Sequence, residues 1–258
     1  MTLYNSIGRG YNRTRQPDPR IVDRLIELLA LAPGKTIADI GAGTGNYSRA
    51  IAERGYQVIA LEPSEVMQAQ AQPHPRVSWV TASAESIPLA DNTVDGAVVM
   101  LALHHFQDIT QGIQEIARIV ADGKIVAFAF EQEKIPDFWL TDYFPYFIND
   151  TKKTFPDTKA IAKIMEDATH KSVEIIPFLL PSDLQDRFAA AGWQQPEIYL
   201  DPEVRNGIST FAKIPPKALK LGLERLSQEL DNGIWEQKYS YLRQQQIYDA
   251  GYRILVVS

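Results

Sequence analysis

Three glycines alternate at positions 41, 43 and 45 of the stretch "TIADIGAGTGNYSRAIAERG", which runs from Thr36 to Gly55. Glycine-rich turns between a strand and a helix let the backbone approach a phosphate or a nucleoside closely. A dinucleotide fingerprint has its third glycine one position later, where this chain has Asn46. The spacing therefore weakens the interpretation that the turn holds NAD.

The charges around the turn also disfavour a diphosphate. Asp39 stands just before the glycines, and no lysine or arginine follows until Arg49. A pyrophosphate gains from the positive end of a helix, but a neighbouring carboxylate opposes it. A ligand with an amino group or a cation suits Asp39 better, and S-adenosylmethionine is such a ligand.

Residues that could take part in binding or catalysis follow two further apolar runs. Glu62 follows "QVIAL", and a carboxylate there could accept charge-assisted hydrogen bonds from a ribose diol. His104 and His105 follow "GAVVMLAL", and an imidazole at that place could act as a general base. The alternative for the histidines is that they line a pocket or bond to the backbone, and both possibilities stay open.

The elements that must position these residues alternate along the first half of the chain. Glycine and proline punctuate runs with strand and helix periodicity, and the strands are rich in β-branched residues, as expected for strands covered on both faces. Strands are expected at 36–40, 57–61, 77–82, 96–101 and 124–130, with helices at 19–32, 45–55, 64–72 and 109–120. This order predicts an α/β fold with a doubly wound, mostly parallel seven-stranded sheet, whose ligands lie at the carboxyl ends of the strands.

The sequence changes character after Phe130. We expect an insertion over 131–180 that acts as a lid, and then the rest of the core sheet over 181–258, with a helical insertion at about 201–250. The segment 1–130 forms the core with its N-terminal cover. In the last part we expect a helix from Ser182 or Asp183 to Gly192, a sixth strand within 193–200, helices at 216–230 and 235–248, and a closing strand at 252–258.

The first insertion is dense in aromatic residues. Its rings Trp139, Tyr143, Phe144 and Phe147 suggest an apolar or mixed pocket. A small satellite core and a dimer surface are the alternatives. The chain is expected to be a monomer or a homodimer.

Composition restricts the partners and the compartment. The chain has 258 residues, 45% of them hydrophobic, and its 26 basic against 32 acidic residues give a net charge of −6. Scattered basic residues make nucleic acid a poor partner, and the longest apolar run is too short to span a membrane. The absence of cysteine excludes disulfides, zinc–thiolate sites and thiol nucleophiles, and we expect no metal site. A polar N-terminus makes the cytoplasm the expected location.

Several motifs together resemble the class I S-adenosylmethionine-dependent methyltransferases, in particular the type 11, UbiE-like members. They appear in the order expected of that family, over about 40–130. The motifs are "DIGAGTG" at 39–45, "ALEPS" around Glu62, "ASAESIPL" at 82–89, "DGAVVMLALHHF" at 95–106 and "QEIARIVADGKIVAF" at 114–128.

This resemblance implies a cofactor site for S-adenosyl-L-methionine. The glycine turn would approach the methionine moiety, the end of the second strand would hold the ribose, and the "ASAESIPL" loop would contact the adenine. Ser83 stands where the family usually has an aspartate. The implied cofactor-binding residues are Asp39, Gly41, Ala42, Gly43, Glu62, Pro63, Ser83, Ala84, Glu85 and Leu101.

The N-terminal segment adds three candidates. "YNSIGRGYNRTRQPDP" resembles the segment that folds over the cofactor in the subgroup containing trans-aconitate methyltransferase. Tyr4 and Tyr11 could place a ring against the sulfonium, and Arg15 could contact the cofactor or an acceptor carboxylate. A partly ordered terminus is the alternative.

The function expected from these features is methyl transfer from S-adenosylmethionine to an oxygen, nitrogen or carbon atom of a small molecule, with a carboxylate among the expected acceptors. The candidate catalytic residues are His104 and His105. A nicotinamide-dependent oxidoreductase on a related fold is one alternative, and a cofactor-binding homologue without turnover is another.

Overall fold

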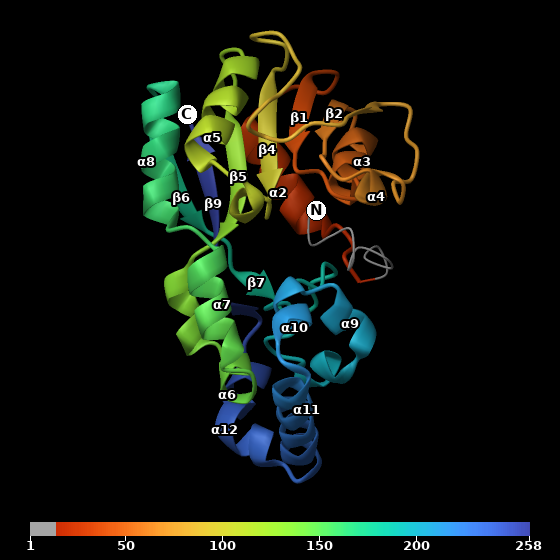
Figure 1. The fold of residues 1–258 in the computed structure, drawn as a ribbon, viewed down its shortest axis with the longest axis vertical. Coiled ribbons are helices and arrows are strands. Elements are labelled where there is room, and N and C mark those ends of the chain that lie inside the picture. Colours follow the sequence, from red (N-terminus) through yellow and green to blue (C-terminus); the bar gives the residue numbers. More distant parts are fainter. Residues whose placement is uncertain (1–13) are drawn as a thin grey trace.

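The computed structural model describes residues 14–258, and a twisted seven-stranded sheet forms the upper part of the molecule in Figure 1. The strand order is β3-β2-β1-β4-β5-β9-β6. The first five strands in this order are parallel, while β9 is antiparallel to both β5 and β6. The strands are β1 (Thr36–Ile40), β2 (Gln57–Leu61), β3 (Val77–Val80), β4 (Gly96–Met100), β5 (Ile125–Phe130), β6 (Val173–Pro177) and β9 (Tyr252–Val257). The predicted fold class is confirmed.

Helices cover both faces of this sheet. One face packs against α2 (Pro19–Leu29) and α3 (Asn46–Glu53), and the other packs against α5 (Ile109–Ile119) and α8 (Thr158–Thr169). A short helix, α4 (Glu65–Gln68), follows β2. Successive strand residues alternate between the two cores, so Val98 belongs to one and Val99 to the other. Double coverage therefore explains the near-continuous apolar strands.

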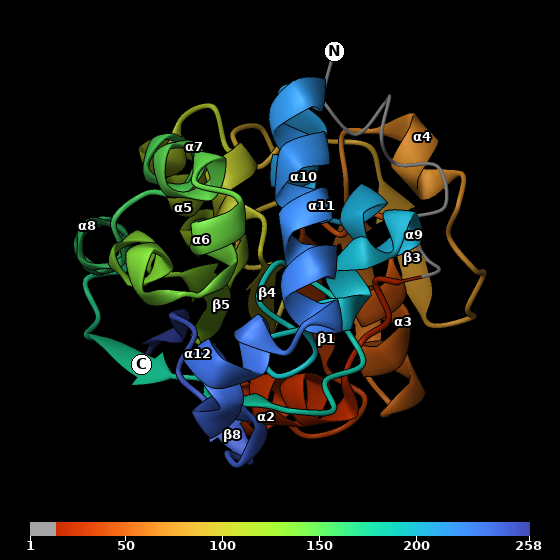
Figure 2. The same cartoon turned by 90° about the horizontal axis from the view of Figure 1, so that it is seen from below.

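A second body of helices, here called the cap, lies below the carboxyl ends of β4 and β5 in Figure 1 and is seen end-on in Figure 2. Its first part follows β5 and consists of η3 (Gln132–Asp137), α6 (Leu140–Tyr143) and α7 (Tyr146–Thr154). Its second part lies between β6 and β9. That part contains β7 (Leu180–Pro181), η4 (Pro196–Leu200), α9 (Pro202–Asn206), α10 (Ser209–Lys213), α11 (Pro216–Asp231), α12 (Ile234–Arg243) and β8 (Ile247–Tyr248).

The boundaries of the first insertion differ from our expectation. Strand β6 lies inside the range 131–180, which we expected to be lid throughout, yet it pairs with β9 at an edge of the sheet. The run "VEIIP" has the β-branched residues of a strand and ends at Pro177. The chain therefore returns from the cap to the sheet through α8 before β6.

Two elements predicted for 182–200 are wrong. The residues 183–192 form turns instead of a helix, because tertiary contacts use their backbone groups: the amide of Gln185 donates to Asp18 Oδ2 at 2.9 Å. The expected sixth strand is the 3-10 helix η4. Within it, the hydroxyl of Tyr199 accepts from the amide of Gly192 at 3.1 Å and donates to the carbonyl of Ala189 at 2.8 Å. These bonds fold the segment back on itself.

The remaining predicted elements are present with shorter ends. Helix α4 stops at Gln68, where a turn begins in which the amide of Gln70 donates to the carbonyl of Met67 at 3.1 Å. Helix α12 stops at Arg243, and the predicted helical residues 247–248 form strand β8 instead. Helix α11 and strand β9 match their predicted ranges closely. None of the helices within residues 14–258 has both the length and the apolar character needed to cross a membrane.

Candidate active site

A cavity of 510 Å³ lies between the carboxyl ends of the parallel strands and the cap. This is within the range of about 300–1,000 Å³ typical of small-molecule sites. Tyr4 and Tyr11 lie outside the described residues. All other predicted site residues line this cavity, namely Arg15, Asp39, Gly41, Ala42, Gly43, Glu62, Pro63, Ser83, Ala84, Glu85, Leu101, His104 and His105.

The glycine turn follows β1 and leads into α3. Gly41 has a φ of +71°, and a Cβ atom added to it would lie 2.6 Å from Cβ of Ala102. Gly43 has a φ of +59°, and its nearest obstacle to a Cβ atom is Cε of Met67 at 3.6 Å. Gly41 is therefore required by packing as well as by backbone conformation, while Gly43 is favoured by its backbone conformation alone, because an added Cβ atom would make only an ordinary contact.

The carboxylate of Asp39 is buried, and one of its oxygens has no hydrogen-bond partner among the described residues. Its side chain is 1% exposed, and Oδ2 accepts a hydrogen bond of 2.5 Å from the hydroxyl of Ser48. Oδ1 is buried without a hydrogen-bond partner among the described residues. Burial raises the pKa of Asp39 to about 6, and the charge of Glu62 adds to this shift. A buried acceptor that lines a cavity and lacks a partner fits the amino group of a ligand.

Glu62, at the end of β2, is held by backbone amides. Its Oε2 accepts from the amide of Gly43 and its Oε1 from the amide of Ser64, both at 2.9 Å. Burial raises the pKa of this carboxyl, and the two amide bonds oppose the rise. Each carboxylate oxygen has a second lone pair, so Glu62 can also accept from a ribose diol.

The loop expected beside the adenine is tied to the residues that follow the fourth strand. Oε1 of Glu85 accepts from the amide of Gln107 at 2.7 Å. Glu85 therefore holds this loop in place, while Ser83 and Ala84 form the wall next to it. Leu101 has a φ of +50°, which is unusual for a residue with a side chain. Such a strained conformation is typical of functional sites.

His104 and His105 lie in the 3-10 helix η2 (Leu103–His105), directly after β4. Their ring centroids are 3.8 Å apart, and the ring of His104 is 4.2 Å from that of Phe155. Burial lowers the pKa of both imidazoles, although His104 is only partly buried and His105 keeps an exposed surface, and the charge of Lys213 lowers both further. At neutral pH both rings are therefore neutral.

Arg15 meets a buried carboxylate in the cap. Its Nε atom lies 2.5 Å from Oδ1 of Asp186, whose side chain is 1% exposed. The hydroxyl of Tyr47 donates to the other oxygen of Asp186 at 3.0 Å. Sequence reasoning missed Asp186, because nothing in its local sequence marks it; only the fold brings it to Arg15.

The cap contributes a second polar group that the sequence did not reveal. Nζ of Lys213, at the end of α10, lies 2.9 Å from Oδ1 of Asp150 in α7. The hydroxyl of Thr210 donates to Oδ2 of Asp150 at 2.8 Å. The helical spacing of Thr210 and Lys213 was the available signal, but α10 has only five residues and no motif.

The aromatic residues of the first insertion divide between two roles. Phe147 lines the cavity. Trp139 packs in a core of the cap, with ring centroids 5.6 Å from Tyr199 and 5.5 Å from Trp235, and its Nε1 donates to the carbonyl of Trp193 at 2.9 Å. A pocket wall and a satellite core, which the sequence left as alternatives, are thus both present.

Comparison with known proteins agrees with this geometry. Residues 38–128 match the family model described as "Methyltransferase domain". A crystal structure of an Anabaena variabilis protein, described as a methyltransferase of an antibiotic biosynthesis pathway, is 46% identical with a TM-score of 0.92, covering 95% of this chain and 99% of that one.

Two curated relatives carry substrate names. The demethylmenaquinone methyltransferase of Corynebacterium urealyticum is 29% identical over 75% of this chain and 84% of its own length. The malonyl-[acyl-carrier protein] O-methyltransferase of Pectobacterium atrosepticum is 32% identical over 46% of this chain and 47% of its own length. With the glycine turn, Asp39 and Glu62 arranged as described, the chain belongs to the class I S-adenosylmethionine-dependent methyltransferases.

Proposed function

We propose that this chain binds S-adenosyl-L-methionine in the cavity and transfers its methyl group to a small molecule held under the cap. One observation supports this most strongly: a single cavity is lined by Asp39 and Glu62 on the sheet side, by His104 after β4, and by Phe147 and Lys213 in the cap. The cofactor and the acceptor would therefore share one enclosed space.

The cofactor would be held by groups that are already oriented. Oδ1 of Asp39, buried without a partner among the described residues, would accept from the amino group. The remaining lone pairs of Glu62 would accept from the ribose hydroxyls, and Pro63, Ser83, Ala84 and Leu101 would contact the nucleoside. When bound, this cofactor supplies an electrophilic methyl group on a sulfonium.

The residues of the chain would act mainly by positioning and by excluding water. Holding two reactants in line can lower a barrier by about 7–11 kcal/mol. We propose that the cap serves as the lid, since Phe138 and Phe147 from it line the cavity. The cap would close over the acceptor while the strand ends hold the cofactor.

We further propose that His104 and His105 contact the acceptor as neutral imidazoles. A general base is most effective when its pKa lies near the working pH, and the pKa of both rings is lowered here. The site therefore suits an acceptor that is already ionised or needs no proton removed. If a histidine base were essential, His105→Gln would lower kcat by about 10²–10⁴.

Calorimetric titration of the chain with S-adenosylhomocysteine, NAD and NADP tests the cofactor assignment. We expect binding of S-adenosylhomocysteine alone, and a stabilisation of about 2.7 kcal/mol at a hundred times its Kd. Glu62→Ala should weaken binding at least about tenfold, because hydrogen bonds to a charged group contribute about 1.5–3 kcal/mol each. Glu65→Ala, in the exposed first turn of α4, is the matched control.

Binding of a nicotinamide cofactor without binding of S-adenosylhomocysteine would contradict the proposal. Equal affinity in Glu62→Ala and in the unmodified chain would remove the ribose assignment. Methyl transfer from labelled S-adenosylmethionine into a metabolite extract then separates an enzyme from a homologue without turnover.

A further inference from the structure

The cap side of the cavity is lined by rings. Phe147, Thr151 and Thr154 are spaced by four and then three residues, so one face of α7 looks into the cavity. Further rings line the space around this face, contributed by Phe130, Phe138, Phe155, Phe188 and Tyr252. Tyr252 lies 5.0 Å from Phe130 and 4.5 Å from Phe188 between ring centroids. Such a wall favours a flat apolar ligand.

One end of this apolar wall carries a cation. Lys213 lines the cavity, and 28% of its side chain is accessible. Its partner Asp150, in α7, is 8% exposed and is not among the residues that line the cavity. Nζ of Lys213 lies 2.9 and 3.2 Å from the two oxygens of Asp150 and 3.4 Å from Oγ1 of Thr154, and Asp150 also accepts from Thr210. The surface that meets the cavity is therefore that of Lys213.

Lys213 differs from the other charged residues that line the cavity. The described carboxylates of the wall are Asp39, Glu62 and Glu85 at the strand ends, and Asp186, which is paired with Arg15. Lys213 differs from Arg15 because its carboxylate partner lies outside the cavity wall. Lys213, His104 and His105 all line the cavity, so the cation and the imidazoles face the same space.

We propose that the methyl acceptor is a small ring-bearing organic acid, whose ring lies against the aromatic wall and whose ionised group is held by Lys213 with the hydroxyl of Thr151. This inference rests on the proposed function and deepens it. It also moves the expected anion site away from Arg15, whose guanidinium is bound by Asp186 at 2.5 Å. Lys213 is a specificity-determining residue in this proposal.

The experiment uses three probes of one shape: 2-naphthoate, 2-naphthamide and 2-naphthylmethylammonium. Each is titrated by calorimetry into the full chain saturated with S-adenosylhomocysteine. We expect 2-naphthoate to bind at least tenfold more tightly than the amide, and the ammonium to bind most weakly. A charge-assisted bond is about twice as strong as a neutral one, which gives this order.

Variants of Lys213 distinguish a loss of ligand specificity from a loss of folding. Lys213→Met should reduce the preference for the acid over the amide to less than threefold, and Lys213→Arg should keep it. Because Lys213→Met leaves Asp150 buried without its cation, the double variant Asp150→Asn/Lys213→Met serves as a charge-neutral version. Lys217→Met, an exposed lysine at the start of α11, is the matched control and should keep the full preference.

Equal binding of the acid and the amide to the unmodified chain would overturn the proposal, as would a preference that survives in both Lys213→Met variants. Failure of all three probes to bind at millimolar concentration would contradict the ring-bearing class. Saturation with S-adenosylhomocysteine is measured first and separately, so a failure of the proposed function is distinguished from a failure of this inference.

Discussion

At the scale of single residues, Asp39 links the stability of the fold to the binding of its cofactor. Its carboxyl has a pKa of about 6 instead of 3.8, mainly because of burial. A group whose pKa is higher in the folded state stabilises the fold fully below its unfolded value, and that contribution is lost as the pH rises to the folded value. At neutral pH the carboxylate is ionised, and only one of its oxygens has a hydrogen-bond donor among the described residues. It therefore opposes folding until a ligand donates to the other oxygen.

Asp39→Asn should stabilise the cofactor-free chain at pH 7 by up to about 3 kcal/mol, from a shift of about two pKa units. The neutral amide keeps a partner for Ser48 and removes the buried charge. The measurement is urea unfolding of both proteins, with affinity for S-adenosylhomocysteine measured in parallel and expected to fall. Ser48→Ala, which removes the hydrogen-bond donor to this carboxylate among the described residues, should destabilise instead. A less stable Asp39→Asn would contradict this explanation.

The same shift predicts how cofactor affinity depends on pH. Only the ionised carboxylate accepts fully from a cationic amino group, so affinity for S-adenosylhomocysteine should be constant above the pKa of about 6 and fall below it. The expected loss approaches about tenfold for each pH unit below that value. Calorimetry from pH 8 to pH 5 measures it. A profile that stays flat over this range in the unmodified chain would show that Asp39 does not titrate with binding.

The variant Gly41→Ala tests whether packing, as well as backbone conformation, requires a glycine at this position. Gly41→Ala places a Cβ atom 2.6 Å from Cβ of Ala102 at a φ of +71°. Left-handed strain costs about 1–2 kcal/mol, and overpacking typically adds about 1–3 kcal/mol. Gly34→Ala is the matched control, because its φ is +90° and nothing lies within 4 Å of an added Cβ atom. Equal losses of unfolding free energy in the two variants would show that the contact with Ala102 has no cost.

Local sequence revealed the sheet side of the site better than the cap side. Asp39, Gly41 and Glu62 stand at ends of strands, and parallel strands bring such ends together. Lys213 and Asp186 carry no comparable signal. They reach the cavity through contacts with Asp150 and Arg15, which are 63 and 171 residues away in the sequence.

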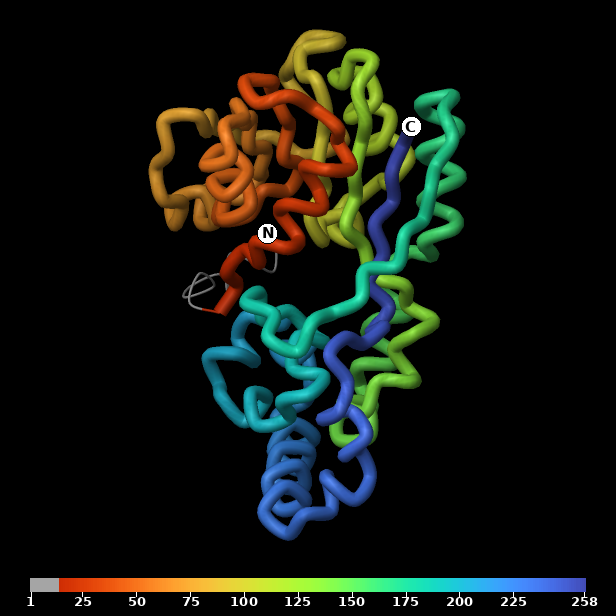
Figure 3. Tube along the Cα trace, turned by 180° about the vertical axis from the view of Figure 1, so that it is seen from behind, coloured from red at the N-terminus to blue at the C-terminus, as the bar shows by residue number. Residues whose placement is uncertain are grey.

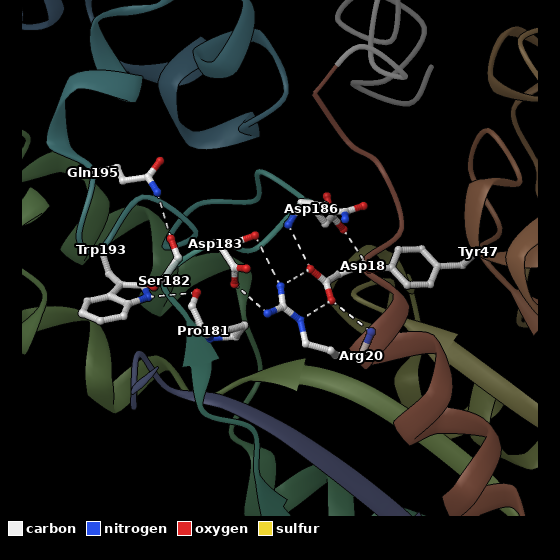
Figure 4. Close-up of polar contacts among 10 residues, drawn as sticks. Asp18, Arg20, Tyr47, Pro181, Ser182, Asp183, Asp186, Trp193 and Gln195 are labelled. Atoms are coloured by element: carbon white, nitrogen blue, oxygen red, sulfur yellow. Dashed lines mark hydrogen bonds and ion pairs between the residues drawn. The ribbon is translucent and has the colours of Figure 1, made fainter. Parts of the chain in front are cut away.

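At the scale of elements, the cap contacts the segment before α2 through a network of carboxylates and arginines, much of which Figure 4 shows. Asp18 caps α2, accepting from the amide of Arg20 at 3.0 Å, and also accepts from the amide of Gln185. Arg20 donates to Asp183 at 2.6 Å. Residues 183–187 are therefore fixed to the N-terminal end of α2 rather than forming a helix of their own.

The buried and exposed members of this network should differ in their effect on stability. Asp186→Ala removes the partner of Arg15 and Tyr47 at a site that is 1% exposed, and breaking a buried pair costs about 3–5 kcal/mol. Asp183→Ala removes a partner of Arg20 whose side chain is 77% exposed, and should change stability far less, because exposed ion pairs are screened by water and salt. Urea unfolding of both variants measures the contrast. Similar losses would mean that Asp186 does not hold the cap.

The elements that sequence reasoning predicted well are those whose periodicity and burial agree. Strands β1 and β5 and helix α5 are regular and flanked by glycine or polar caps. The segment 196–200 has the apolar residues of a strand, but the hydroxyl of Tyr199 and the turn around Gly192 impose a 3-10 helix. Such contacts between a segment and its neighbours in the chain override a weak strand preference.

At the scale of the whole molecule, the chain passes between sheet and cap after β5, between α7 and α8, after β6 and before β9, as the tube in Figure 3 shows. The segment before α2 makes a separate contact with the cap, where the amide of Arg187 donates to the carbonyl of Thr14 at 3.0 Å. The cavity lies between these two bodies. The groups that we assign to the cofactor come from the sheet side, and those that we assign to the acceptor come from the cap and from the ends of β4, β5 and β9.

A crystal structure of the chain with S-adenosylhomocysteine tests the central claim most directly. We expect the amino group of the ligand within hydrogen-bond distance of Asp39 Oδ1, its ribose on Glu62, and its sulfur facing the space between His104 and the cap. Electron density for the ligand outside this cavity, or a ligand inside it whose sulfur points away from the cap, would contradict the proposed function.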